Sequence, residues 1–103
     1  MSSEPSSISI EGLVRFAQAK KDDDTWEMGE VIRRFRPLAR RLAGAAGAKL
    51  GLADDLENAA YRGLVRAVRK HDLSRLGFAS FAESYMRGEV LRFSEGTLFV
   101  RVL

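Results

Sequence analysis

The residues that could perform catalysis or hold a metal are few. The chain has one histidine, His71, and no cysteine, so neither a Cys-His pair nor a cluster of zinc ligands is expected. The segment Gly44–Lys49 places glycines before a lysine, as a phosphate-binding loop does, but no Ser or Thr follows and no strand is expected before it. The helix dipole alone favours acidic residues in the first turn of a helix, so the acidic residues that begin at Asp54 do not indicate a metal site. The sequence therefore predicts no enzyme activity, no metal and no cofactor.

Positive charge is concentrated in the middle of the chain, although the formal net charge is only +3. Residues 31–53 contain six basic and no acidic residues, whereas residues 1–30 contain three basic and seven acidic residues. The six basic residues are Arg33, Arg34, Arg36, Arg40, Arg41 and Lys49. Such a block attracts phosphate through counterion release, and it suits a solvated helix face equally well.

Apolar spacing predicts about four helices and hence an all-α domain. The first helix is expected over residues 10–20. Asp24 lies three residues before Glu27, a capping-box pattern that predicts the start of a second helix extending to about Ala46. Pro37 lies inside this second helix, where it predicts either a kink or a break.

The second half of the chain predicts two further helices and an irregular tail. A third helix opens at Asp54, and a fourth, with a broad apolar and aromatic stripe, is expected over residues 78–93. Ser94-Glu-Gly96 is expected to stop the fourth helix, and the β-prone end of the chain is expected to be irregular. The predicted division is a disordered lead over residues 1–9, a helical domain over 10–93 and a C-terminal tail over 94–103.

Composition predicts a soluble cytoplasmic protein. The absence of cysteine suits a reducing compartment. No apolar run approaches the roughly 18 residues of a membrane span, and the Ser-rich start lacks the basic and apolar parts of a secretory signal. No membrane association is expected.

Two long motifs in register resemble the region-two domain of bacterial RNA polymerase sigma factors. The first, Asp54-Asp-Leu-Glu-Asn-Ala-Ala-Tyr-Arg-Gly-Leu-Val-Arg-Ala-Val-Arg-Lys-His-Asp72, resembles the helix that binds core polymerase. The second, Gly77-Phe-Ala-Ser-Phe-Ala-Glu-Ser-Tyr-Met-Arg-Gly-Glu-Val-Leu-Arg-Phe93, resembles the promoter-melting helix. Together with similar lead-in helices, the likeness covers about residues 10–93. It implies a region-two fold, core RNA polymerase and promoter DNA as partners, and a role in transcription initiation.

The resemblance implies two sets of contact residues. In the family, the third helix grips a coiled coil of the polymerase's largest subunit, a helix-on-helix contact. The matching positions here are Asp54, Asp55, Asn58, Ala59, Tyr61 and Val65. The fourth helix of the family binds the exposed non-template strand of the minus-ten element, with aromatic residues that stack on unpaired bases. The matching positions here are Phe78, Ser80, Phe81, Ser84, Tyr85, Arg87, Gly88, Leu91 and Arg92. For Phe81, burial in the core and contact with DNA are equally expected.

Departures from the family pattern indicate an alternative sigma factor and leave a second function open. Ala59 stands where a Glu is usual, Glu57 where an apolar residue is usual, and Arg62 where Ile is common, so polymerase binding is expected to be weakened or retargeted. Ser84 replaces the first of an aromatic pair that primary sigma factors carry. The alternative function is a sigma-like decoy or adaptor that binds an anti-sigma factor or a second sigma subunit, and a nonspecific nucleic-acid-binding bundle is a third interpretation.

No helix-turn-helix domain for the minus-thirty-five element precedes the final residue, Leu103. Three explanations stay open. The chain is a domain of a longer sigma factor, a natural region-two-only protein that works with a second subunit, or a sigma mimic that occupies an anti-sigma factor.

Overall fold

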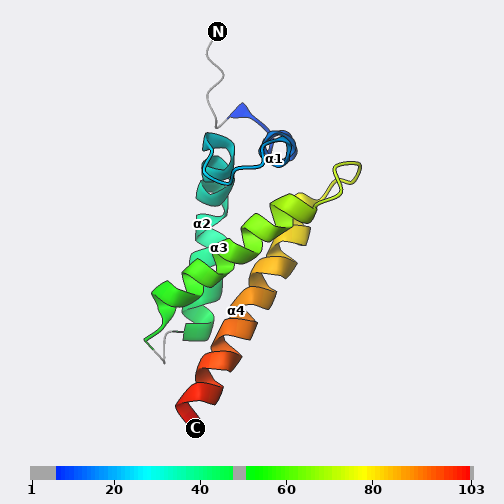
Figure 1. The fold of residues 1–103 in the computed structure, drawn as a ribbon. Helices are drawn as coiled ribbons and strands as arrows, with labels where there is room; N and C mark the ends of the chain where they lie inside the picture. The colour runs from blue at the N-terminus through cyan, green and yellow to red at the C-terminus, as the bar shows by residue number, and fades with distance from the viewer. Residues whose placement is uncertain (1–6, 48–50, 103) are drawn as a thin grey trace.

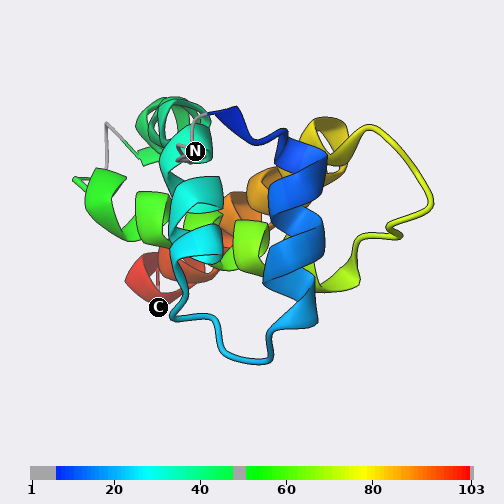
Figure 2. The same cartoon turned by 90° about the horizontal axis from the view of Figure 1, so that it is seen from above.

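The computed structural model describes residues 7–47 and 51–102, and these residues form four α-helices and no strand (Figure 1). The helices are α1 (Ile10–Ala19), α2 (Trp26–Gly47), α3 (Ala53–Lys70) and α4 (Phe78–Val102). α3 crosses α2 and α4 runs beside α3, while α1 lies at one end next to the first turns of α2 (Figures 1 and 2). The prediction of an all-α domain of about four helices is confirmed. None of the described helices is both long and apolar enough to cross a membrane.

Helix α1 begins at the predicted residue because Ser9 caps it. The Ser9 hydroxyl accepts a hydrogen bond from the Gly12 backbone N–H at 3.1 Å, which satisfies one of the free donors at the helix start. Leu13, Val14 and Ala17 then turn inward and are buried. Most of the predicted disordered lead lies outside the described residues.

Helix α2 begins one residue later than the capping-box prediction requires. The Thr25 hydroxyl accepts a hydrogen bond from the Met28 backbone N–H at 3.3 Å, whereas the Asp24 N–H donates to the Asp22 side chain at 2.9 Å. Thr25 is therefore the cap, and the prediction of a capping box that starts at Asp24 is wrong. Glu27 is instead buried and forms an ion pair with Lys20 at 2.8 Å.

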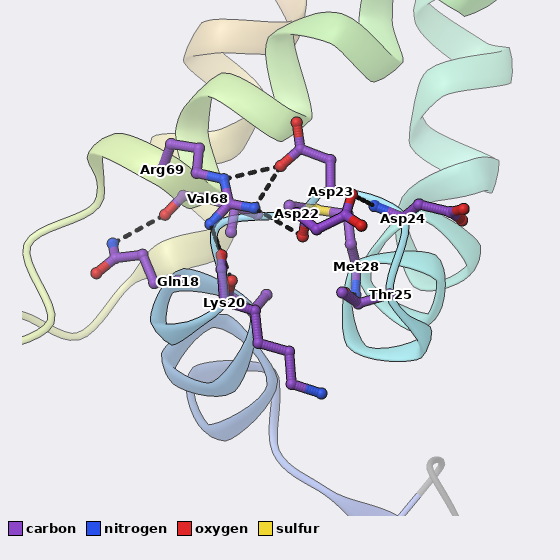
Figure 3. Close-up of polar contacts among 10 residues, drawn as sticks. Gln18, Lys20, Asp22, Asp23, Asp24, Thr25, Met28, Val68 and Arg69 are labelled. Carbon is purple, nitrogen blue, oxygen red and sulfur yellow. Dashed lines mark hydrogen bonds and ion pairs between the residues drawn. The ribbon is translucent and has the colours of Figure 1, made fainter.

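Pro37 bends α2 without breaking it. The helix is continuous from Trp26 to Gly47, but its first turns run alongside α1 while its later turns point in another direction (Figures 2 and 3). A proline removes one helical hydrogen bond and its ring clashes with the carbonyl four residues earlier, which is Arg33 here. Of the two alternatives that the sequence leaves open, the kink is the one observed.

All four helices contribute to the core, and α2, α3 and α4 supply most of its buried side chains. Its largest fully buried side chain, Phe78, packs edge-on against Phe35 with ring centroids 5.7 Å apart. Gly63 lets α3 and α4 approach closely, because a Cβ at this position would lie 2.6 Å from the Tyr85 carbonyl oxygen and 2.9 Å from Met86 Cα. The third and fourth helices are thus fixed against each other by backbone contact.

Helix α4 continues to Val102, so the prediction of an irregular tail from Ser94 is wrong over the described residues. A glycine ends a helix by adopting positive φ. Among the described glycines only Gly51 and Gly77 do so. Gly96 keeps a helical conformation, which costs about 1 kcal/mol relative to alanine. The β preference of the following residues is also too weak to end the helix without a partner strand.

A polar clasp joins α3 to α1 and to the loop after α1 (Figure 3). The Arg69 guanidinium donates to the carbonyl oxygens of Ala17 at 2.9 Å, Lys20 at 2.5 Å and Asp22 at 3.1 Å, and it pairs with the Asp23 carboxylate. In return, the Gln18 side-chain amide donates to the Val68 carbonyl at 2.8 Å and to the His71 carbonyl at 2.7 Å. These bonds satisfy backbone carbonyls at the C-terminal ends of α1 and α3. They are called the Arg69 clasp below.

Candidate functional site

One exposed row on α3 contains most of the predicted polymerase contacts. Asp54, Asn58, Tyr61 and Val65 are spaced by four, three and four residues, which places them on one face of the helix. This set is called the α3 row. The first two are exposed and the last two half-buried, and Asp55 is exposed beside them. Ala59 is fully buried, so its side chain is not available to a partner in this structure.

Glu57 and Arg40 orient Tyr61 in the α3 row. The Tyr61 hydroxyl donates to Glu57 Oε2 at 2.5 Å, and Arg40 of α2 approaches the same oxygen at 3.5 Å. Burial raises the pKa of Tyr61, and the hydrogen bond and charge of Glu57 raise it further, so the phenol stays protonated. The unusual Glu57 is therefore partly neutralised by α2, a contact that the sequence pattern does not reveal because it joins residues far apart in the chain.

All of the predicted DNA contacts on α4 except Phe78 lie on one face of this helix or at its edge. Exposed side chains or backbone occur at Ser80, Ser84, Arg87, Gly88, Leu91 and Arg92. This set is called the α4 face. Phe81 and Tyr85 are half-buried at its edge, with ring centroids 4.9 Å apart. Phe78 is fully buried in the core, so no DNA base can reach it while the domain is folded.

The arginines of the α4 face are held by surface ion pairs. Arg87 pairs with Glu83 at 2.5 Å, and Arg92 pairs with Glu89 at 3.1 Å. Both arginine side chains are more than half exposed. Exposed ion pairs contribute only about 0–1 kcal/mol, so a phosphate can replace the carboxylate at little cost.

A hollow of about 310 Å³ opens at the start of this face, against the loop between α3 and α4. It is called the loop hollow, and it is lined by Lys70, His71, Asp72, Arg75, Leu76, Gly77 and Phe81. Phe81 and His71 contribute aromatic rings, and Lys70 and Arg75 contribute positive charge beside the Asp72 carboxylate, which lies 3.7 Å from Arg75. Except for Phe81, none of these residues is among the predicted contacts, because the loop lies between the two motifs. Lys70 and Arg75, the basic residues that precede Gly77, were the available signal.

A second hollow, of about 370 Å³, lies between the end of α2 and the middle of α4. Leu42, Ala45, Val90 and Leu91 give it an apolar lining, and Arg87 stands at its side. Leu91 is 57% exposed. The α4 face therefore has a hollow at its start and another beside its middle.

Three of the five arginines in the basic block form ion pairs within the domain. Glu30 accepts two hydrogen bonds from Arg33, at 2.8 and 2.6 Å, and one from Arg34 at 3.0 Å. The hydrogen bonds from Arg33 and then Arg34 lower the pKa of Glu30 to about 2. Arg40 pairs with Glu57, as above, and Lys49 lies outside the described residues. The block is thus partly a set of structural ion pairs.

The low pKa of Glu30 predicts an acid-dependent loss of stability. Because the folded-state pKa of about 2 lies below the ordinary value of 4.5, ionised Glu30 stabilises the fold above pH 4.5, and this contribution is lost as the pH falls toward 2. Glu30→Gln is expected to be less stable than the unmodified protein at neutral pH, with the difference shrinking as acid is added. Urea unfolding of both proteins from about pH 6 to about pH 3 measures this. A difference that is constant across the range would contradict the assignment.

Among the described residues, no group of three or more His, Asp or Glu side chains is placed to hold a metal ion. Comparison of the chain with protein-family models, with curated proteins and with solved structures found no significant match. The likeness to sigma factors therefore rests on the two sequence motifs, and the roles that it implies are proposals.

Proposed function

We propose that the chain is a transcription-initiation module of an alternative sigma factor. The α3 row docks on the coiled coil of the largest subunit of core RNA polymerase. The α4 face and the loop hollow bind the unpaired non-template strand of the minus-ten element. The observation that carries this proposal is the α4 face, where exposed arginines and half-buried aromatic rings lead to a hollow that Phe81, Lys70 and Arg75 help to line.

The chemistry of the α4 face fits a single strand better than a duplex. Unpaired bases stack on rings such as Phe81 and Tyr85, while arginines such as Arg87 neutralise phosphates. Because these rings lie at the edge of a helix beside a concave loop, a base must leave its stack to reach them. Duplex DNA presents no free base face to such a site.

The two proposed surfaces do not overlap, which supports simultaneous binding of polymerase and DNA. The α3 row lies on the side of α3 next to α2, where Arg40 meets Glu57. On the other side of α3, Arg66 pairs with Glu89 of α4 at 2.9 Å and Arg62 stacks over Phe93. These two arginines separate the α3 row from the α4 face.

Loss of a ring from the α4 face is expected to weaken binding of single-stranded DNA. Tyr85→Ala should reduce the binding free energy by about 1–3 kcal/mol, the usual contribution of one stacked base. Tyr85→Phe, which keeps the ring, should bind nearly as the unmodified protein does. Fluorescence anisotropy with a labelled, mixed-sequence single-stranded pool measures the affinity, and the same pool as duplex should bind more weakly.

Phe16→Ala is the matched control, because Phe16 is an exposed aromatic residue on α1, outside the α4 face. It should leave the affinity unchanged. The contrary result is that Tyr85→Ala and Phe81→Ala bind the single-stranded pool as tightly as the unmodified protein, with a steep dependence on salt. Arginines would then attract the DNA nonspecifically. That result would contradict the assignment of the α4 face.

A further inference from the structure

His71 is the residue at which α1, α3 and α4 meet beside the loop hollow. It follows the last residue of α3, and its backbone N–H donates to the Ala67 carbonyl at 2.9 Å. Its own carbonyl is held by Gln18 of α1 at 2.7 Å, as part of the Arg69 clasp. Its ring is buried between the rings of Phe78 and Phe81, with centroid distances of 5.2 and 5.3 Å.

The same ring also fixes the loop that follows it. His71 Nε2 lies 3.2 Å from the Arg75 carbonyl oxygen. A carbonyl oxygen only accepts hydrogen bonds, so the ring tautomer with its proton on Nε2 donates to it. One side chain therefore contacts Phe81 in the lining of the loop hollow and holds the backbone of Arg75.

The rest of the loop is folded by short-range hydrogen bonds. The Asp72 carboxylate accepts from the backbone N–H of Ser74 at 2.9 Å and from its hydroxyl at 2.7 Å, and the Asp72 carbonyl accepts from the Arg75 N–H at 3.0 Å. The hydrogen bonds from Ser74 lower the pKa of Asp72, so the carboxylate stays ionised in this role. Gly77, at φ +85°, makes the turn into α4. The loop is thus a defined structure whose position depends on how its ends are held.

His71 lines two hollows. One is the loop hollow, and the other is a smaller hollow of about 80 Å³, which Glu11 and Arg15 of α1 help to line. Removing the ring would leave Phe81 without its neighbour on that side. Phe81 is only half-buried, so its position depends strongly on such a neighbour.

We propose that His71, anchored by Gln18, is a positioning residue that keeps the loop hollow preformed for an unpaired DNA base. The proposal rests on the function proposed above for α4 and adds a role for α1, which braces the DNA-binding loop through Gln18. His71 itself is buried and need not touch DNA. It acts by holding the Phe81 ring and the Arg75 backbone in the positions in which they bind a base.

Preformation has a measurable consequence for affinity. When only a fraction of molecules hold a site in its binding-competent form, the apparent affinity falls by that fraction. If His71→Ala leaves about one molecule in ten with an ordered loop, binding of the single-stranded pool weakens about tenfold. Gln18→Leu, which removes the anchor from α1 and leaves the ring in place, should weaken binding in the same direction by a smaller factor.

The test combines DNA affinity with amide hydrogen exchange on the DNA-free protein. The expected result is weaker binding by both variants, with faster exchange at the Ser74 and Arg75 amides and unchanged exchange in the middle of α3. If the unmodified protein and both variants bind DNA equally, the positioning role is overturned.

Hydrogen exchange separates this inference from the proposed function. If the unmodified protein fails to bind the pool, the DNA-binding proposal fails. Faster loop exchange in both variants would then still support positioning by His71, and unchanged exchange would overturn it. Gln18→Leu leaves the core ring in place, so it remains informative if His71→Ala does not fold.

Discussion

Replacement of Arg69 by methionine is expected to lower the free energy of unfolding by about 3 kcal/mol, because net contributions of hydrogen bonds to charged groups reach about 1.5–3 kcal/mol each and are not additive. The Arg69 guanidinium serves three carbonyl oxygens and the Asp23 carboxylate at once. Methionine keeps the apolar stem of the side chain but removes the guanidinium, so the Lys20 and Asp22 carbonyls and the Asp23 carboxylate lose this donor, while the Ala17 carbonyl keeps only the Lys20 N–H at 3.2 Å. Urea unfolding followed by circular dichroism measures the change.

Arg66→Met is the matched control, since Arg66 lies one turn earlier on the same helix. Its ion pair with Glu89 is a single bond at 2.9 Å from a side chain that is 59% exposed. Pairs of this kind contribute about 0.2–1 kcal/mol. Similar losses for the two variants would mean that the Arg69 clasp is no stronger than an ordinary surface contact.

Gly63→Ala is expected to destabilise the domain by about 2 kcal/mol. Overpacking of this kind costs about 3 kcal/mol when the clash is with backbone atoms, and the better helix propensity of alanine returns about 1 kcal/mol. At Gly63 the new methyl group would meet the Tyr85 carbonyl oxygen at 2.6 Å, so α3 and α4 must move apart. The expected readout is a lower urea midpoint.

Gly29→Ala makes the same chemical change where a Cβ has no neighbour within 4 Å. Gly29 is an exposed position in α2, so this variant should be more stable by up to about 1 kcal/mol. Opposite signs for the two substitutions are the expected result. Stabilisation by Gly63→Ala would show that α3 and α4 do not make the close contact described.

The presence of four helices was predictable from the sequence. The residues at which the helices begin and end were predictable where neighbouring residues alone determine them. The apolar spacing of α1 predicts its extent to within a residue, and the acidic residues at Asp54 predict the start of α3 to within a residue. The start of α2 was misplaced by one residue because Asp24 and Thr25 are adjacent competing caps, and only the observed bond from Met28 decides between them. The end of α4 was misplaced because a glycine stops a helix only through its φ, which its position in the sequence does not specify.

The candidate site was predictable as helix faces, while its long-range contacts were not. Residues three and four apart share a face, so the α3 row and the α4 face follow from spacing. Whether a residue of those motifs is buried depends on which part of the chain packs against it, which residue spacing does not specify. Ala59 and Phe78 are buried in this way, so they are not accessible on the α3 row or the α4 face. The pairing of Arg69 with Asp23 and of Gln18 with His71 joins residues about fifty positions apart, which no local pattern specifies.

Affinity for core RNA polymerase, purified without a sigma factor, is the measurement that tests the central claim most directly. The protein is titrated against immobilised core polymerase, beside a variant that carries Asp55→Ala and Tyr61→Ala. Specific binding that this variant loses is the expected result, because an aromatic residue at the centre of a docking face typically contributes about 2 kcal/mol or more. Ser84→Ala, on the α4 face, should bind polymerase as the unmodified protein does, and thermal unfolding checks that every variant is folded. Absence of binding by the unmodified protein would contradict the initiation function and favour a decoy that binds an anti-sigma factor.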